Sequence, residues 1–187
     1  VNVPGLYIMS EDEMSPIIGI ERVEGMAQYL CEITGSPIVC DDYKEVPDMP
    51  KQERPSVDLF VMSHCPYGLQ MEKGLLPVIE VLGENVDFNL RFVYYVMHGE
   101  KEVIEQTRQY CIQKDQNDKF LDYMNCFVIE GNSEECSESS NIDAAALNLC
   151  INKTDSEFSI IENLYDESSY LSGKYPLFNI DKDLNDK

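Results

Sequence analysis

The segment VDLFVMSHCPYG, residues 57–68, places a short apolar run directly before a cysteine and a proline. The run predicts a strand that is buried on both faces, because it lacks alternation. Pro66 suits the first turn of a helix, where no intrahelical acceptor awaits its missing N–H. Cys65 would then lie at a helix N-terminus, where unpaired N–H groups and the helix dipole favour a thiolate. The segment therefore predicts a nucleophilic cysteine at a strand-to-helix junction.

The residues that follow predict a βαβ unit. A helical pattern covers residues 66–82, with Pro77 inside it and Gly83 at its end. Residues 86–97 first alternate and then become wholly apolar, which predicts a second, long strand. A strand, a helix and a strand in so short a stretch are typical of two parallel strands joined by a crossover helix. We therefore expect an α/β fold.

Helices are predicted for most of the chain after this unit. The periodicity favours helices over 100–114 and 116–129, a third helix capped by Asn141, and a fourth that Asp155 opens and Gly173 ends. Because cysteines recur among these segments, we expect a cysteine-rich helical insertion at about 100–172.

Two domains are predicted. Residues 1–50 form an N-terminal arm with a helix and a loop between Cys31 and Cys40, which a short turn can bring to bridging distance. A charged, proline-rich linker ends this arm. Residues 51–187 then carry the βαβ unit and the helical insertion.

The seven cysteines suit three structural disulfides and one free thiol. Besides Cys31–Cys40, the favoured pairings are Cys111–Cys150 and Cys126–Cys136, which leave Cys65 as the odd cysteine. The last pair flanks a Gly-Asn-Ser turn, although other connectivities stay open at this stage. Disulfides persist in oxidising compartments, so we expect the extracellular space, a cell envelope, or a secretory or lysosomal lumen. The alternative is a cytosolic protein with reduced, buried and inert cysteines.

The composition excludes several classes of partner. Lys and Arg number 14 against 35 Asp and Glu, a net charge of −21 that repels nucleic acid phosphates and anionic lipid headgroups. No apolar run approaches the ~18 residues that span a bilayer. We expect no metal or cofactor, since the cysteines lack close pairs and only two histidines are present. The glutamates at 134, 135 and 138 lack calcium-loop spacing and predict a solvated turn.

Two histidines lie near the expected thiol. His64 precedes Cys65, where it either acts as a neighbouring cation that lowers the pKa of the thiol or points into solvent. His98 ends the second strand, and parallel strands end at the same edge of a sheet. It is either a polar group over the thiolate or part of a turn at Gly99. The other residues expected to shape the site are Pro66, Tyr67 and Gly68.

Two motifs resemble a known superfamily. Cys-Pro-Tyr at 65–67, after its apolar strand, is similar to the active-site segment of the thioredoxin superfamily. His98-Gly99-Glu100-x-Glu102, with Gln109 and Cys111 downstream, resembles the signature region of the lysosomal thiol reductases (GILT-like). The helical insertion resembles this group and the DsbA-like oxidoreductases. The resemblance covers about residues 57–172 and implies a thioredoxin fold, with thiol–disulfide exchange as the ancestral activity.

Two departures from this superfamily shape the prediction. Gly68 replaces the second cysteine of C-x-x-C, so a mixed disulfide on Cys65 needs an outside thiol for its release. The superfamily also has a cis-proline strand that faces the cysteine, and Tyr175-Pro176 is the candidate here. We expect that the chain stops before the true cis-proline hairpin.

These features together predict single-cysteine thiol–disulfide exchange through a mixed disulfide on Cys65. The expected partners are a disulfide-containing or thiol-bearing protein and a small-molecule thiol. The alternative is a non-catalytic thioredoxin-like module that binds peptides or a protein partner in the secretory or envelope compartment. A third hypothesis is a disulfide-stapled accessory domain of a larger protein. Gly68 decides whether the chain is an enzyme.

Overall fold

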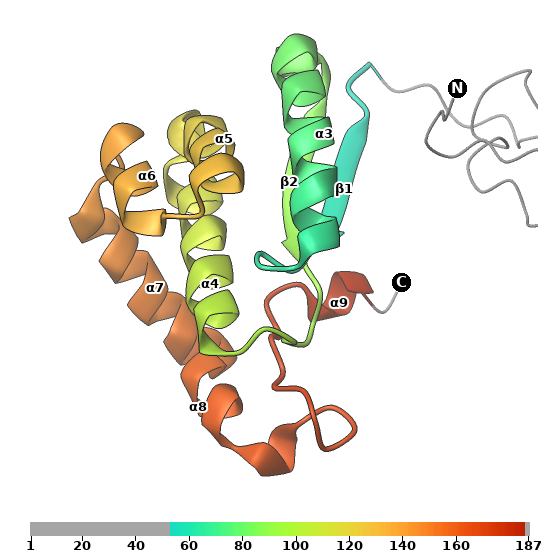
Figure 1. Cartoon of the computed structure of the whole chain (residues 1–187), viewed down its shortest axis with the longest axis vertical. Coiled ribbons are helices and arrows are strands. Elements are labelled where there is room, and N and C mark those ends of the chain that lie inside the picture. Colours follow the sequence, from blue (N-terminus) through green and yellow to red (C-terminus); the bar gives the residue numbers. More distant parts are fainter. Residues whose placement is uncertain (1–52, 186–187) are drawn as a thin grey trace, which may run out of the picture. The chain divides into compact units, whose positions relative to one another are not determined.

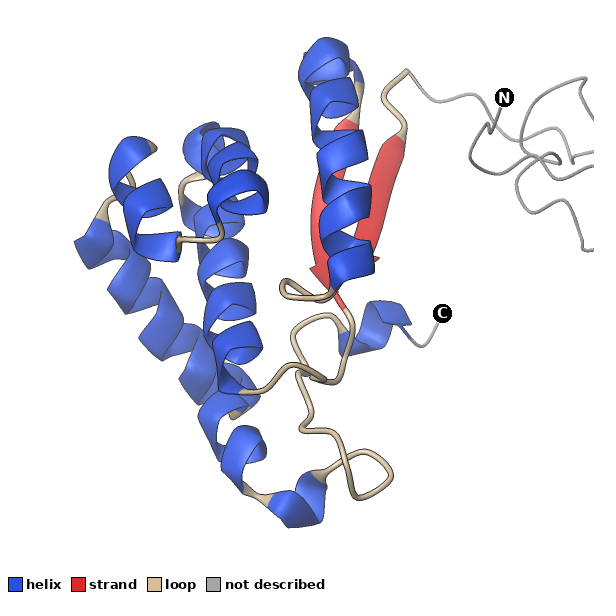
Figure 2. Ribbon diagram, in the orientation of Figure 1, coloured by secondary structure: helices blue, strands red, loops and turns tan. Residues whose placement is uncertain are grey.

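The computed structural model describes residues 53–185, which adopt a mixed α/β fold (Figures 1 and 2). The elements in chain order are β1 (Ser56–Val61), α3 (Pro66–Leu82), η2 (Gly83–Asn85), β2 (Asp87–Phe92), α4 (Glu100–Asp115), η3 (Asn117–Lys119), α5 (Phe120–Glu130), α6 (Ser133–Ser139), α7 (Ala144–Phe158), α8 (Ile160–Tyr165), η4 (Glu167–Ser169) and α9 (Lys182–Asn185). The predicted N-terminal arm, with Cys31 and Cys40, lies outside the described residues. None of the helices within 53–185 is long and apolar enough to cross a membrane.

β1 and β2 are parallel neighbours joined by α3, which confirms the predicted strand–helix–strand unit. Their register extends from Ser56 opposite Asp87 to Val61 opposite Phe92. The N–H of Val93 donates to the carbonyl of Val61 at 3.1 Å, so the pairing continues to the last residue of β1. The two loops that follow the strands therefore start from neighbouring positions.

Two expectations about the strands are wrong. β1 alternates between partly covered and exposed positions, and only Val61 is buried, because within residues 53–185 the sheet has just two strands. β2 is shorter than predicted because β1 offers it no partner beyond Val61. The segment after β2 bonds instead to the C-terminal segment. There the N–H of Val96 donates to Pro176 at 2.9 Å, and the N–H of Phe178 donates to Tyr94 at 2.8 Å.

Side chains supply hydrogen bonds to β2 that β1 does not. The amide group of Gln113 donates to the carbonyl of Leu90 at 3.1 Å and accepts from its N–H at 2.7 Å. Asp181 accepts from the N–H of Phe92 at 2.9 Å, and the side chain of Asn185 donates to the carbonyl of Phe92 at 3.1 Å. Leu90 and Phe92 are buried, so these bonds satisfy backbone groups that water does not reach. The side chains do here what a further strand would do.

α3 occupies the predicted residues, Pro66–Leu82. Pro66 stands at the first helical position, where its fixed φ suits the helix. Gly83 ends the helix with a φ of +52° and donates its N–H to the carbonyl of Ile79. The residues of the buried face recur every three to four positions, as an amphipathic helix requires: Gly68, Glu72, Leu76 and Ile79.

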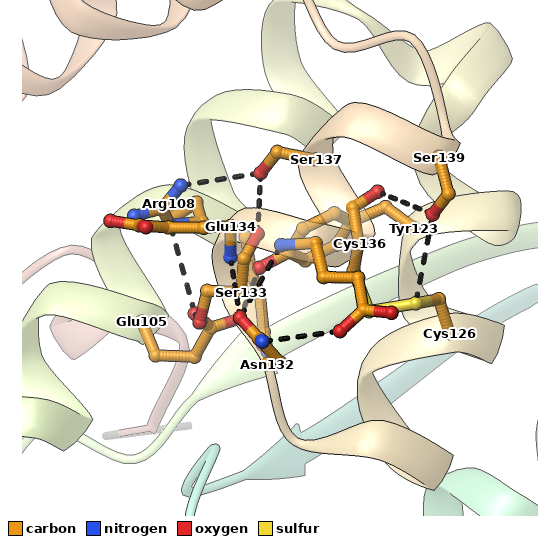
Figure 3. The surroundings of a disulfide bond; sticks show 12 residues. Glu105, Arg108, Tyr123, Cys126, Asn132, Ser133, Glu134, Cys136, Ser137 and Ser139 are labelled. Carbon is orange, nitrogen blue, oxygen red and sulfur yellow. Dashed lines mark hydrogen bonds and ion pairs between the residues drawn. A yellow bond between two sulfur atoms is a disulfide. The ribbon is translucent and has the colours of Figure 1, made fainter.

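α6 forms in a stretch that was predicted to be a solvated turn. The side-chain oxygen of Asn132 accepts the N–H groups of Glu134 and Glu135 at 3.2 and 3.3 Å, as Figure 3 shows. An asparagine in this position satisfies N–H groups that have no partner inside the helix. The prediction missed this cap because glutamates far outnumber apolar residues in the stretch.

The ends of α7 and α8 also differ from the prediction. Asp143, not Asn141, caps α7, and its Oδ1 accepts from Ala145 and Ala146 at 2.9 and 3.0 Å. Asp155 opens no helix, because α7 continues past it. Ser159, with a φ of +51°, separates α7 from α8. A left-handed residue is a common way to end a helix, but serine gives little sequence signal for it.

Two disulfides join helices in the second half of the chain. Cys111 of α4 is bonded to Cys150 of α7, with 5.7 Å between the Cα atoms. Cys126 of α5 is bonded to Cys136 of α6, with 5.5 Å between the Cα atoms. These are the pairings that the sequence spacing favours. The core around them combines residues of the βαβ unit and of the helices, including Val61, Leu76, Leu90, Phe92, Val103, Ile112, Phe120, Tyr123, Phe127, Leu147, Ile160 and Phe178.

Candidate functional site around Cys65

Cys65 lies at the N-terminal cap of α3, where the chain turns from β1 into the helix. Its N–H donates to the carbonyl of Met62 at 2.9 Å, and its carbonyl accepts from the N–H of Leu69 at 2.9 Å. The thiol makes no capping hydrogen bond, and the residue is partly exposed. Among the cysteines of residues 53–185 it is the free one. These bonds hold the backbone of Cys65, and the residue stays partly exposed.

Gly68 packs against the end of β1. A Cβ at this position would lie 3.1 Å from the carbonyl oxygen of Met62 and 3.4 Å from the Cβ of Val61. Such a contact is tighter than a side chain normally makes in a packed interior. The neighbouring Tyr67 is instead 84% exposed. The position that would hold the second cysteine of C-x-x-C is therefore shaped for glycine.

His64 is partly buried. Its ring packs edge-to-face on Phe127 of α5, with 5.8 Å between the ring centres. Burial lowers the pKa of His64 below 6.5, and the positive charge of Lys101 lowers it as well. Both effects favour the neutral ring over the cation. Its contact with Phe127 fastens the cysteine loop to α5.

The first turns of α4 hold the loop that leads to Cys65. The N–H of Ser63 donates to the side-chain oxygen of Gln106 at 3.3 Å. The hydroxyl of Ser63 donates to the backbone carbonyl of Glu102 at 3.3 Å. All three residues are buried, so water does not compete for these bonds. Since α4 starts directly after His98 and Gly99, the loops after both strands meet at this helix.

Glu102 joins the same turn of α4 to His98. Its Oε1 accepts the backbone N–H of Met97 at 2.9 Å and that of His98 at 3.4 Å. Its Oε2 is bonded to Nδ1 of the His98 ring. Glu102 is fully buried, whereas the side chain of His98 is 29% exposed. A carboxylate placed behind an accessible imidazole orients the ring.

Two buried carboxyl groups, Glu72 of α3 and Glu105 of α4, lie apart from the cysteine loop. Glu72 is fully buried, and neither of its carboxyl oxygens has a hydrogen-bond partner among the described residues. Burial, and then the nearby charge of Glu105, raises the pKa of Glu72 from 4.5 to about 8. Glu105 accepts from Gln109 at 2.8 Å and from Tyr123 at 2.7 Å. It also accepts from the hydroxyl of Ser133, which lies beside it in Figure 3. Glu72 is therefore mostly protonated at neutral pH.

No protein-family model, curated protein or solved structure matches this chain. The resemblance to the thioredoxin superfamily therefore depends on the motifs at 65–68 and 98–102. Within residues 53–185, no group of three or more His, Cys, Asp or Glu side chains is placed to hold a metal ion.

The sequence pointed to the cysteine loop and to His98, and the structure attaches both to the start of α4. It also included Glu102 in the motif that begins at His98. It did not point to Ser63, Gln106 or Glu72. A signal was present for one of these three residues. Glu72 lies on the apolar stripe of α3, where a charged residue is rare unless its environment neutralises it.

Proposed function

We propose that this chain is a thioredoxin-like protein that exchanges disulfides through the single thiol of Cys65. The observation that carries the proposal is a free, partly exposed cysteine at the N-terminus of α3. The four other cysteines of the described residues are paired with one another. The parallel βαβ unit and Pro66 at the first helical position support the same proposal.

The proposed reaction is a displacement at sulfur. The thiolate of Cys65 attacks one sulfur of a protein disulfide, forms a mixed disulfide and expels the other sulfur as a thiolate, which takes up a proton. Gly68 offers no second thiol. A small-molecule or protein thiol therefore attacks the mixed disulfide and regenerates Cys65. Electrons pass from that thiol to the substrate, so the exchange needs no cofactor.

Incubation with oxidised glutathione tests this proposal. We expect the protein to gain the mass of one glutathionyl group, which peptide mapping places on Cys65, and reduced glutathione to remove it. Cys65→Ser should abolish the adduct and leave the unfolding midpoint unchanged, because the thiol makes no hydrogen bond that holds the fold.

An ordinary exposed thiol provides the matched control. Asn148 is exposed on α7, so the double variant Cys65→Ser/Asn148→Cys carries a free thiol away from the site. We expect Cys65 to react at least about tenfold faster than this thiol, as activated cysteines do. Equal rates would contradict the proposal.

The two disulfides of the described residues support an oxidising compartment. The extracellular space, a cell envelope and a secretory or lysosomal lumen all fit this condition. Non-reducing mass mapping of the protein from its native source tests the point. Four free thiols at these positions would place the protein in a reducing compartment.

A non-catalytic binding module is the second candidate. α3 exposes Tyr67, Met71 and Val81 at 84%, 58% and 86%, on the helix that carries Cys65. Exposed apolar side chains on one element favour contact with an apolar partner. Under this hypothesis a cysteine-free apolar peptide binds the protein and its Cys65→Ser variant equally well. Met71→Ser would weaken that binding, whereas the exposed Leu149→Ser on α7 would not.

A further inference from the structure

We propose that Glu102 is a positioning residue that holds His98 as the proton carrier for disulfide exchange at Cys65; this inference rests on the proposed function. The loops that follow β1 and β2 start at the same edge of the sheet. Glu102 forms hydrogen bonds to the backbone and ring of His98, and these leave Nε2 of the ring for proton transfer.

The topology puts His98 and Cys65 at one edge of the sheet. β1 and β2 are parallel and end at paired residues, Val61 and Phe92. The cysteine loop is then bonded to α4 through Ser63, and the His98 loop leads directly into α4. The imidazole and the thiol therefore belong to the same small region.

Glu102 fixes both the place and the tautomer of the His98 ring. Its Oε1 takes the N–H groups of Met97 and His98, which sets the backbone on which the ring stands. Its Oε2 takes Nδ1. A carboxylate only accepts hydrogen bonds, so Nδ1 carries the hydrogen, and Nε2 of the neutral ring carries a lone pair. Glu102 takes Nδ1 and the side chain of His98 is 29% exposed, so Nε2 is the ring nitrogen available for proton transfer.

His98 in this place can carry the proton that moves during the exchange. When the thiolate of Cys65 attacks a disulfide R–S–S–R′, one S–S bond forms, one breaks, and protonated His98 gives its Nε2 proton to the leaving R′S⁻. A second thiol R″SH then returns a proton to Nε2 as it attacks the mixed disulfide. The products are R–S–S–R″ and the Cys65 thiolate. The R′ sulfur is reduced and the R″ sulfur is oxidised, so electrons and protons balance.

Two disulfides with different leaving groups test the role of Glu102. Oxidised glutathione expels a basic thiolate that needs a proton, whereas 5,5′-dithiobis(2-nitrobenzoate) expels a weakly basic one that does not. We expect Glu102→Gln and His98→Asn each to slow the reaction with oxidised glutathione about tenfold or more. The same variants should keep the rate with the aryl disulfide within about twofold. Glu100→Gln, an exposed change in the same turn, should alter neither rate.

The pH dependence and the ring tautomer give two further readouts. The charged group in direct contact with His98 is Glu102 on α4. The ratio of the glutathione rate to the aryl rate should depend on pH in the unchanged protein, and this dependence should vanish in His98→Asn. Nitrogen NMR of the neutral ring should show hydrogen on Nδ1, and on Nε2 in Glu102→Gln, because the new amide donates to Nδ1.

The outcomes separate this inference from the proposed function. An equal loss with both disulfides, or no loss with either, would overturn the role of His98 and Glu102 while exchange at Cys65 stands. If Glu102→Gln does not fold, the result for His98→Asn decides alone. If the unchanged protein reacts with neither disulfide, the proposed function itself fails.

Discussion

Gly68 stands where a two-cysteine site would carry its second thiol. The atoms around it leave little room for a side chain at this position. A Cβ there would lie 3.1 Å from the carbonyl of Met62, at the junction of β1 and α3. Gly74, further along the same helix, has no atom within 4 Å of an added Cβ. The two glycines of α3 therefore give an internal comparison of packing and helix propensity.

We expect Gly68→Ala to lower the free energy of unfolding by about 1 kcal/mol, because overpacking at the end of β1 outweighs the better helix propensity of alanine. Gly74→Ala should raise it by about 0.5 to 1 kcal/mol, because only the propensity changes. Urea unfolding followed by circular dichroism measures both values. Equal stabilisation by the two changes would show that packing does not constrain Gly68.

Glu72 should contribute more to the stability of the fold in acid than at neutral pH. Its pKa is raised in the folded state, so the folded chain holds a proton that the unfolded chain releases above about 4.5. The stabilisation that this proton on Glu72 provides is fully present below pH 4.5, and it is lost as the pH rises through about 8. A shift of this size corresponds to roughly 3 to 5 kcal/mol.

Glu72→Gln should remove this pH dependence, since an amide has no proton to lose. We expect its free energy of unfolding to change less between pH 5 and pH 8 than that of the unchanged protein. Glu84→Gln, in an exposed turn, should leave the pH dependence as it is. The same pH profile for Glu72→Gln and the unchanged protein would show that Glu72 is ionised in the folded state.

At the scale of elements, the hydrogen bonds between α4 and β2 show how a two-stranded sheet is kept in place. Gln113 forms both of its bonds to Leu90, whose backbone is buried. Removing the amide leaves a buried N–H and a buried carbonyl without partners. Each such group costs about 1 to 3 kcal/mol.

We therefore expect Gln113→Ala to lower the free energy of unfolding by about 2 kcal/mol. The amide of Leu90 should also lose protection against hydrogen exchange more than the amides of α7 do. Gln70→Ala, an exposed change on α3, should alter stability by less than about 0.5 kcal/mol. If both variants are equally stable, Gln113 does not support the strand.

At the scale of the whole molecule, the two disulfides close loops of different length. Cys111 and Cys150 are separated by 39 residues in the sequence, and Cys126 and Cys136 by 10. A longer closed loop restricts the unfolded chain more, so the first bond should stabilise the fold more strongly. It also joins α4, which holds the cysteine loop, to α7.

Replacing Cys111 and Cys150 together by alanine should lower the free energy of unfolding by about 4 kcal/mol, against about 3 kcal/mol for Cys126 and Cys136. Denaturant unfolding of the two double variants measures the difference. We also expect the first pair to be the more important for reactivity at Cys65, because α4 carries Glu102 and Gln106. The opposite order of stabilities would contradict the loop-length argument.

The sequence by itself determined the local features of this protein. Apolar periodicity together with Pro66 and Gly83 defined α3, and cysteine spacing favoured the disulfide pairings, because such signals act over a few residues or a short loop. The sequence pattern predicted β2 too long, because a strand ends where its partner strand ends. It did not predict α6, because a single capping side chain, Asn132, starts that helix. Only the tertiary structure decided the contacts between distant residues. Ser63 meets Gln106 and Gln113 meets Leu90 because whole elements pack together. No local pattern encodes which polar groups, such as the carboxyl group of Glu72, that packing removes from water.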